Sequence, residues 1–364
     1  MTEIHIIKKF QRVLISRTAA NLKHGAEIVR LAGETSVPVK EFADDATVVQ
    51  HCEAELPSTL QILSIPTTGW IAKADFGLLA SRTNEYYLHP IVGCRFGCTY
   101  CYLLAMPHGR RPLRLYVATD DLLKSIDHKL KERSAGERTL FCTGELADSL
   151  AELDIYPVAA VLTEFFAHRT DARLELRTKS ENVDRLLPLD HKGNTTVAFS
   201  IAPQENITEY EPGTASLSQR IQSARKCQLA EYPVAFKFEP LILTPNWREL
   251  YQETFRFIAA NVDVTRIEHV SVGCLRWSKG LSEMSVFAKR HGSTVECGTW
   301  IEYGPSQFNG TVRRSDRLFA YELMRQMLRE HGIVAPIWWS LEEGDLIAEL
   351  KRRDLEMARA VSTP

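Results

Sequence analysis

Short apolar runs, each about the length of one β-strand, alternate with longer segments of helical periodicity through the middle of the chain. Within the longer segments apolar side chains recur three or four positions apart, which is the spacing of one helix face. Strands that alternate with helices are typical of βαβ units, whose strands pair in parallel. The six runs predicted as strands are 85–93, 138–144, 173–180, 195–201, 234–243 and 266–275.

The number of these units predicts an α/β fold with a partial (β/α)6 barrel. A closed barrel of eight units takes about 250 residues, which is more than lie between Glu85 and Leu275. In such barrels the reactive groups come from the C-terminal ends of the strands. The candidates at strand ends, expected on one rim, are the loop around Cys94, Cys142, Lys179, Ser200 and Glu239.

The segment 216–232 shows the helical spacing clearly. Its predicted apolar face consists of Leu217, Ile221, Ala224 and Cys227. The basic side chains predicted to lie off that face are Arg220, Arg225 and Lys226. Such an amphipathic helix is expected to cover one face of the sheet.

The chain is expected to have three parts. Residues 1–84 form an N-terminal extension packed on the barrel, for which a partly ordered arm is the alternative. Residues 85–276 form the barrel, and residues 277–364 form a C-terminal appendage that binds substrate. Within the appendage, turn residues predict a hairpin over 295–314, followed by a helix.

The composition is that of an ordinary globular protein, with 45% hydrophobic and 25% charged residues. No apolar run approaches the roughly 18 residues of a membrane-spanning helix, and the start of the chain lacks the pattern of a signal peptide. Eight cysteines without the spacing of a disulfide framework indicate a reducing compartment, so we expect a cytoplasmic monomer. A net charge of −2 means that a nucleic-acid partner would need a local basic groove.

Three of the cysteines, Cys94, Cys98 and Cys101, are spaced C-x3-C-x2-C. Thiolates select zinc, copper(I) or iron–sulfur centres. Three protein ligands leave one metal position free, for substrate or water at zinc or for a cofactor at the fourth iron of a [4Fe-4S] cluster. A zinc site with a distant fourth ligand, such as Cys52 or a histidine, is the weaker alternative because zinc sites usually show paired C-x2-C halves.

This spacing, with an aromatic residue just before the third cysteine, resembles the signature of the radical S-adenosylmethionine (SAM) superfamily. Further motifs resemble the spore photoproduct lyase family, in the same order, over roughly residues 58 to 275. Those motifs are GCRFGCTYCYL at 93–103, CTGE at 142–145, RTKS at 177–180, AFSI at 198–201, YEPGTASLSQRI at 210–221 and YPVAFKFEPLI at 232–242. That family reverses a UV-induced thymine dimer in DNA by radical chemistry, which is a lyase reaction that cleaves a carbon–carbon bond.

The resemblance implies that Cys94, Cys98 and Cys101 hold a [4Fe-4S] cluster that binds SAM. An electron, supplied by a donor such as flavodoxin or ferredoxin, would cleave SAM to a 5′-deoxyadenosyl radical. That radical would abstract a hydrogen atom from the substrate. This chemistry belongs to the cofactor, while the protein supplies position and excludes water.

The resemblance also implies that Cys142 donates a hydrogen atom, for which the weak S–H bond is suited. The alternative is a small buried side chain of the core, which is the common place of a free cysteine. Tyr100 and Tyr102 match tyrosines that relay the hydrogen onward, and Tyr102 matches a SAM contact as well. Both tyrosines could instead simply pack beside the cysteines.

SAM presents an amino group, a carboxylate, ribose hydroxyls and a sulfonium. Glu145, after Gly144, offers an acceptor for the amino group, and Lys179 offers a cation for the carboxylate. A solvated Lys179–Glu145 pair at a strand end is the alternative. Ser200 offers a hydroxyl, and the main chain at Glu239 matches an adenine contact of the family.

Some positions depart from the family pattern. Gly144 and Glu145 stand where the family has Ser-Asp, and the predicted hairpin differs from the family's Lys- and Tyr-rich one. Cys274 stands at a predicted strand end as either a second redox thiol or, more simply, a core residue. These departures keep open a radical SAM enzyme with another nucleic-acid or small-molecule substrate.

For contact with DNA the sequence offers basic and aromatic residues. Arginines could neutralise phosphates, and aromatic side chains could stack on or wedge between bases, although a basic loop is more often a solvated surface. The candidates are Arg110, Arg111, Arg114, Arg313, Arg314, Trp300, Tyr303 and Phe308. The alternative that is not an enzyme is a zinc-binding nucleic-acid module, and the repeated βαβ pattern argues against it.

Overall fold

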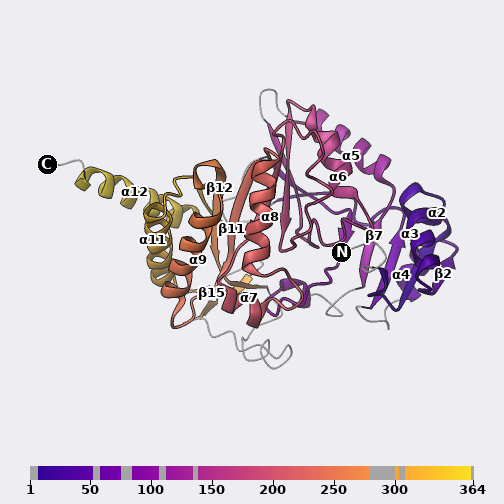
Figure 1. Ribbon diagram of the computed structural model, residues 1–364, viewed down its shortest axis with the longest axis horizontal. Coiled ribbons are helices and arrows are strands. Elements are labelled where there is room, and N and C mark those ends of the chain that lie inside the picture. Colours follow the sequence, from indigo (N-terminus) through magenta and orange to yellow (C-terminus); the bar gives the residue numbers. More distant parts are fainter. Residues whose placement is uncertain are drawn as a thin grey trace.

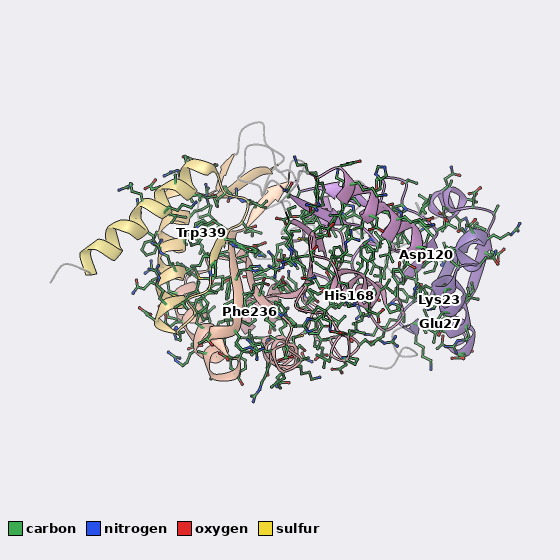
Figure 2. All side chains as sticks on the ribbon, turned by 90° about the horizontal axis from the view of Figure 1, so that it is seen from above. Lys23, Glu27, Asp120, His168, Phe236 and Trp339 are labelled. Atoms are coloured by element: carbon green, nitrogen blue, oxygen red, sulfur yellow. The ribbon has the colours of Figure 1, made fainter. Side chains whose placement is uncertain are left out.

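Two sheets and their helices form an elongated molecule, with the N-terminal elements at one end and α11 (Arg314–Glu330) and α12 (Gly344–Val361) at the other (Figure 1). The computed structural model describes residues 7–51, 58–74, 84–105, 112–133, 138–278, 300–302 and 308–361. Viewed from above, Lys23 and Glu27 lie near one end of the body and Trp339 toward the other (Figure 2). Among the helices of the described part, none is long and apolar enough to cross a membrane.

The smaller sheet has the strand order β2-β1-β3-β7-β6. Its strands are β1 (Arg12–Ser16), β2 (Val39–Phe42), β3 (Thr59–Leu63), β7 (Leu113–Tyr116) and β6 (Ile91–Val92). Its helices are α2 (Arg17–Ala20), α3 (Lys23–Glu34) and α4 (Asp45–His51). The first four strands pair in parallel, and β6 is antiparallel to β7. Strands β6 and β7 belong to this sheet although they follow residue 84 in sequence, so the sheet includes residues from both sides of the predicted boundary. The division of the chain at residue 84 stays a prediction.

The larger sheet has the order β16-β12-β11-β10-β9-β8-β5-β4 and is open, since β16 and β4 stand at its two edges. Its strands are β4 (Ile71–Lys73), β5 (Glu85–Leu88), β8 (Thr139–Thr143), β9 (Ala172–Thr178), β10 (Thr195–Ser200), β11 (Val234–Leu241), β12 (Ile267–Cys274) and β16 (Ile337–Trp339). All neighbours from β5 to β16 pair in parallel. The predicted partial barrel is confirmed, with β4 and β16 added at its edges.

Helices follow most of these strands. They are α5 (Thr119–Lys131), α6 (Val158–Ala167), α7 (Gln204–Tyr210), α8 (Leu217–Leu229) and α9 (Trp247–Asn261), with short 3-10 turns η1 (Tyr102–Ala105) and η2 (Val264–Arg266). The start of α8 is fixed by a capping box between Ser216 and Gln219, which satisfies two otherwise unpaired backbone donors. The apolar face predicted for α8 is buried.

The prediction for Arg220 is wrong, because its side chain is fully buried rather than exposed. Its guanidinium donates to the carbonyls of Ala215 and Ser200 and pairs with Glu211 at 2.5 Å. These acceptors, together with the hydroxyl oxygen of Thr214 at 2.7 Å, compensate the loss of hydration, which is what allows a charged side chain inside the protein.

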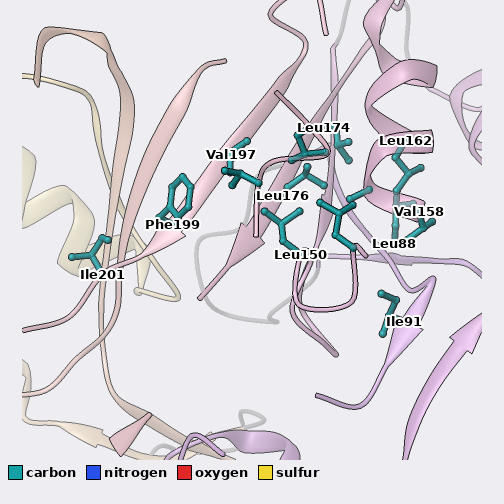
Figure 3. Packing of buried hydrophobic residues seen from close by; sticks show 14 of the residues in the cluster. Leu88, Ile91, Leu150, Val158, Leu162, Leu174, Leu176, Val197, Phe199 and Ile201 are labelled. Carbon is teal, nitrogen blue, oxygen red and sulfur yellow. The ribbon is translucent and has the colours of Figure 1, made fainter. Parts of the chain in front are cut away.

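One face of the larger sheet carries apolar side chains. Leu174 and Leu176 of β9 and Val197 and Phe199 of β10 gather in one cluster with side chains of α6 (Figure 3). Because successive side chains of a strand point to opposite faces, the residues between these leucines, such as Glu175, belong to the other face. We call that other face of the larger sheet the inner face. Its side chains include Cys142, Glu175, Arg177, Lys237 and Ser271.

Beyond the barrel, β13 (Arg276–Ser278), β15 (Phe308–Val312) and β14 (Trp300–Glu302) form an antiparallel sheet. β14 and β15 are the two arms of the predicted hairpin, whose turn at 303–307 lies outside the described residues. Arg276 and Arg317 share the buried carboxylate of Glu342, at 2.5 and 3.2 Å. These ion pairs join the C-terminal helices to the end of β12.

Candidate active site

The loop from Gly93 to Tyr102, here called the three-cysteine loop, is fixed by backbone hydrogen bonds. The amide of Gly93 donates to Leu146 just after β8, at 2.9 Å. The amides of Gly97 and Thr99 donate to Pro212 and Tyr210 just after α7, each at 2.8 Å. The loop is therefore held against the ends of the parallel strands, where the sequence places the reactive groups.

Gly93 has a conformation and a site that require glycine. Its φ is +89°, and a Cβ there would lie 2.7 Å from the carbonyl oxygen of Pro112. Other residues rarely adopt that φ, and none fits so close to the backbone. The tight approach turns the chain into the loop directly after β6.

The three thiols form a soft donor set. Cys98 is buried, and Cys94 and Cys101 are partly buried. Burial raises the pKa of Cys94, and the charge of Asp148 and of the other two thiols adds to it. Among the described residues, no three His, Cys, Asp or Glu side chains stand where they could hold a single metal ion. The ligands of an iron–sulfur cluster need not surround a single metal ion, because its cysteines bind different irons.

Behind the loop lies an ion pair of Arg95 with a buried carboxyl. The Nε of Arg95 is 3.3 Å from Oε1 of Glu152. Burial raises the pKa of Glu152 to about 7, although Arg95 lowers it in part. Protonation of Glu152 near neutral pH therefore changes the charge behind the three-cysteine loop.

Tyr100 is fixed by charged partners. Its hydroxyl donates to the carboxylate of Glu211, which is paired with Arg220. Burial would raise the pKa of Glu211, but Arg220 and Lys179 outweigh it and lower that pKa. The ammonium of Lys179 also lies 5.9 Å from the centre of the Tyr100 ring. Glu211 was not singled out from the sequence.

Lys179 lies on the side of the loop that carries Cys98. Its amide donates to the carboxylate of Asp148 at 2.6 Å. Burial lowers the pKa of the Lys179 ammonium, but the negative charges of Glu211 and Cys98 outweigh burial and raise it. The side chain therefore remains a cation close to the loop.

Tyr102 and Glu145 meet on the other side of the loop. The hydroxyl of Tyr102 donates to the backbone carbonyl of Glu145 at 2.9 Å, and the Glu145 carboxylate is 2.7 Å from Nε2 of His89. Gly144 has φ +92°, and a Cβ there would lie 2.6 Å from the carbonyl of Arg177. Only glycine allows β8 to turn away this close to β9.

Ser200 and Glu239 complete the predicted set. Ser200 is the last residue of β10, and its carbonyl accepts from Arg220 at 2.8 Å. Glu239 on β11 accepts from the hydroxyl of Ser271 and lies 3.3 Å from the ammonium of Lys237. Burial would raise the pKa of Glu239, but Lys237 and the Ser271 hydroxyl lower it. This carboxylate is therefore charged and held by the inner face.

Cys142 is fully buried on the inner face, among charged side chains. Arg177 donates from Nη2 to its sulfur at 3.1 Å. The thiol lies 3.5 Å from Oε1 of Glu85 and 4.0 Å from Oε1 of Glu175. We call Cys142, Glu85, Glu175 and Arg177 the thiol network.

The charges of the thiol network are paired. Arg177 lies 2.6 Å from both Glu85 and Glu175, and Glu175 also faces Lys237 and His269. Burial raises the pKa of Cys142 well above its ordinary value; Arg177 opposes this, and Glu175 and Glu85 reinforce it. The sulfur is therefore a neutral thiol that still carries its hydrogen.

Glu85, Glu175 and Arg177 were not predicted as site residues from the sequence. The sequence pattern that could have identified buried charged residues on this strand is the alternation of charged and apolar residues along 172–178. A buried charge is stable only if it is paired, so charged residues at every second position of a central strand predict partners across the sheet.

The predicted DNA-contact residues lie in separate places. Arg114 is on β7, where its Nε donates to Gln61 at 2.6 Å, and Arg314 on α11 pairs with Asp345 and Glu349. Arg313 caps α11 and is exposed. Those outside the described residues are Arg110, Arg111 and Tyr303, as is Cys52 of the zinc alternative; Trp300 and Phe308 fall on β14 and β15.

Cys274 lies in the hydrophobic core at the end of β12. Burial raises the pKa of its thiol to about 12. This position agrees with the simpler of the two alternatives, a core residue.

An open parallel sheet with the three-cysteine loop and a buried thiol at its strand ends defines a protein of the radical SAM fold. The family model described as spore photoproduct lyase matches residues 11–291. The chain therefore belongs to the spore photoproduct lyase family.

Relatives and solved structures agree with this assignment. The chain is 32% identical to the spore photoproduct lyase of Bacillus subtilis over 176 residues, which cover 48% of this chain and 51% of the relative. It is 26% identical to that of Clostridium acetobutylicum over 248 residues, or 68% and 73% of the two chains. The first of these alignments spans about half of the relative.

Two solved structures of spore photoproduct lyase share the fold. A variant with a cysteine changed to alanine superposes with a TM-score of 0.77 at 22% identity, covering 91% of this chain and 99% of the other. A structure described as complexed with dinucleoside spore photoproduct has a TM-score of 0.76 at 22% identity, with the same coverage. The likeness extends to the N-terminal sheet and the C-terminal elements as well as the barrel.

Proposed function

We propose that this protein is a radical SAM lyase that uses a [4Fe-4S] cluster to cleave SAM and repairs a UV thymine photoproduct in DNA. Membership of the spore photoproduct lyase family supports the reaction class. The observation that carries the proposal is a fully buried thiol, Cys142, near the end of β8, where the three-cysteine loop is also anchored. A thiol in that state can give a hydrogen atom to a carbon radical.

Cys94, Cys98 and Cys101 would hold the cluster, since three thiolates are the donor set that iron–sulfur centres use. When bound, the cluster supplies the electron and SAM the 5′-deoxyadenosyl radical. The backbone bonds from Gly97 and Thr99 to residues 210–212 hold the loop in place for this.

The chain offers each polar end of SAM a partner. The Lys179 ammonium suits the carboxylate, because Glu211 keeps it charged, and the Glu145 carboxylate suits the amino group. Gly144 lets that turn approach closely. The remaining contacts in this proposal are Tyr102, the hydroxyl of Ser200 and the main chain at Glu239.

In this proposal Cys142 returns a hydrogen atom to the product radical. Arg177 and Glu85 fix the direction of its thiol, since both contact the sulfur. Tyr100 and Tyr102 relay hydrogen onward. Fixing a donor before reaction removes the entropic cost of orienting it during reaction.

The partners follow from the same proposal. The substrate is DNA with a thymine photoproduct, in keeping with the dinucleoside spore photoproduct named in the complex of a related protein. The electron comes from a donor such as flavodoxin or ferredoxin. We infer a cytoplasmic location, because the cluster requires a reducing compartment, and we expect a monomer.

Anaerobic reconstitution with iron and sulfide tests the proposal. The brown protein is expected to cleave SAM on reduction and to convert a dinucleotide thymine photoproduct back to the repaired dinucleotide, with an undamaged dinucleotide as the control. A colourless protein that holds one zinc ion would overturn the proposal. SAM cleavage without repair would assign the site to another substrate.

A further inference from the structure

Tyr87 lies directly beside Cys142. The two residues are register partners on the parallel strands β5 and β8, so their side chains point to the same face. Tyr87 is 6% exposed and packs with Cys142 in one small cluster. Tyr87 was not predicted as a site residue from the sequence.

Arg177 joins the phenol to the thiol. Its Nη1 donates to the Tyr87 hydroxyl oxygen at 3.0 Å, and its Nη2 donates to the Cys142 sulfur at 3.1 Å. The guanidinium carbon also lies 5.2 Å from the centre of the Tyr87 ring. Because a guanidinium is planar and rigid, one side chain fixes the oxygen and the sulfur relative to each other.

Arg177 is itself fixed by Glu85 and Glu175, each at 2.6 Å. The Tyr87 oxygen accepts the bond from Arg177. In the three-cysteine loop, the hydroxyl of Tyr100 donates to Glu211 and that of Tyr102 to the carbonyl of Glu145.

We propose that Tyr87 is a catalytic residue that restores the hydrogen atom of Cys142 after each turnover. This inference rests on the proposed function, in which Cys142 gives its hydrogen atom to the product radical. The resulting sulfur radical takes a hydrogen atom from Tyr87: the phenol O–H bond breaks, the S–H bond forms, and the unpaired electron moves to the phenol oxygen. Tyr102, already placed in the relay, supplies the next hydrogen atom to Tyr87.

The surroundings favour transfer of a whole hydrogen atom. Proton or electron transfer alone would create a charge on a buried sulfur or oxygen, which is costly away from water. Burial raises the pKa of both Cys142 and Tyr87, which keeps both groups neutral.

Tyr87→Phe tests this inference, with Tyr86→Phe as the matched control. Tyr86 also loses one hydroxyl, but its ring packs on Phe141, 5.8 Å between ring centres. The measured quantity is the number of SAM molecules consumed for each photoproduct repaired. We expect Tyr87→Phe to raise that ratio on the order of tenfold, equivalent to about 1.4 kcal/mol on the relay step, and Tyr86→Phe to leave it unchanged.

A second measurement needs neither cluster nor SAM. Radiolysis of the cluster-free protein generates sulfur radicals, and absorbance follows the tyrosyl radicals that they form. We expect a transfer phase that is lost in both Cys142→Ala and Tyr87→Phe and kept in Tyr86→Phe. Thermal unfolding of the variants shows whether each is folded.

A fluorinated tyrosine at position 87 separates chemistry from packing. It keeps the hydroxyl and its bond to Arg177 but changes how readily the hydrogen leaves, so an altered ratio of SAM to product is expected. If Tyr87→Phe and Tyr86→Phe give the wild-type ratio while the wild type repairs the photoproduct, Tyr87 is not in the relay. A wild-type protein that repairs nothing would overturn the proposed function itself.

Discussion

The three-cysteine loop is anchored just after β8, the strand that carries Cys142 of the thiol network, but the loop and the network are built in different ways. Gly93, Gly97 and Thr99 of the loop are held by backbone hydrogen bonds to segments distant in the chain. Cys142 of the network is held by side chains, through Arg177 and two carboxylates. The loop can thus lose a thiol without losing its anchors, whereas the loss of Arg177 from the network removes the ion pair of the Glu85 carboxylate and one of the ion pairs of Glu175.

This difference separates chemistry from stability. The thiols of the loop take no part in those backbone bonds as side chains, so their removal is expected to abolish cofactor binding and to change folding little. Arg177 compensates two buried carboxylates, so its removal is expected to affect folding strongly.

Cys98→Ala is expected to have the largest effect on function. Removing one of three thiols should abolish binding of the intact cluster and reductive SAM cleavage, and lower the free energy of unfolding of the cluster-free protein by only about 1 kcal/mol. Iron content, SAM cleavage and urea unfolding measure these effects. Cys227→Ala, on a buried face of α8, is the control that should keep its iron. Full SAM cleavage by Cys98→Ala would refute the ligand assignment.

Arg177→Met is expected to have the largest effect on stability. It leaves Glu85 and Glu175 without their shared partner, and breaking a buried ion pair costs about 3–5 kcal/mol. Urea unfolding of the cluster-free protein measures the loss. Arg17→Met removes an exposed pair with Glu41 and should cost no more than about 1 kcal/mol. Equal losses for the two variants would mean that the thiol network is not held by charge.

Glu152→Gln is expected to change the pH dependence of stability behind the loop. The pKa of Glu152 is about 7 in the folded protein, against about 4.3 in an unfolded chain. The folded state therefore keeps a proton that the unfolded chain releases. The stabilisation of the folded state by this proton is complete below the unfolded-state pKa of about 4.3. It falls by at most about 3 kcal/mol as the pH rises to 7.

The variant should lose that part of the pH dependence and be more stable than the wild type at pH 8. Urea unfolding at pH 5 and pH 8 checks both expectations. A Glu152→Gln profile parallel to the wild type would show that Glu152 does not titrate in this range. The predicted change in stability is smaller than that for Arg177→Met, because Arg95 already stabilises part of the charge.

The central sheet could be predicted from sequence because each of its strands has a recognisable local sequence pattern. Buried parallel strands appear as short apolar runs, and six such runs became β5 with β6, β8, β9, β10, β11 and β12. The first run was only partly right: it breaks at His89 and Pro90, and its second half joins the smaller sheet as β6. The second half joins the smaller sheet because β6 pairs with β7. That pairing cannot be predicted from the local sequence pattern.

The thiol network could not be predicted because its members are far apart in the chain. Glu85 and Arg177 are 92 positions apart and meet only when β5, β8 and β9 are assembled. Arg220 was misplaced because its partners Glu211 and the carbonyl of Ser200 lie outside the helix, 9 and 20 positions earlier in the chain. The cysteine spacing, in contrast, is local and was visible at once.

The most direct test of the account is the product formed by Cys142→Ala, compared with the wild type on a dinucleotide thymine photoproduct under anaerobic conditions. We predict that the variant still binds iron and cleaves SAM, but that the product radical, without a hydrogen donor, ends in products other than the repaired dinucleotide. Repaired dinucleotide in the wild-type yield, with the wild-type consumption of SAM, would contradict the role of Cys142.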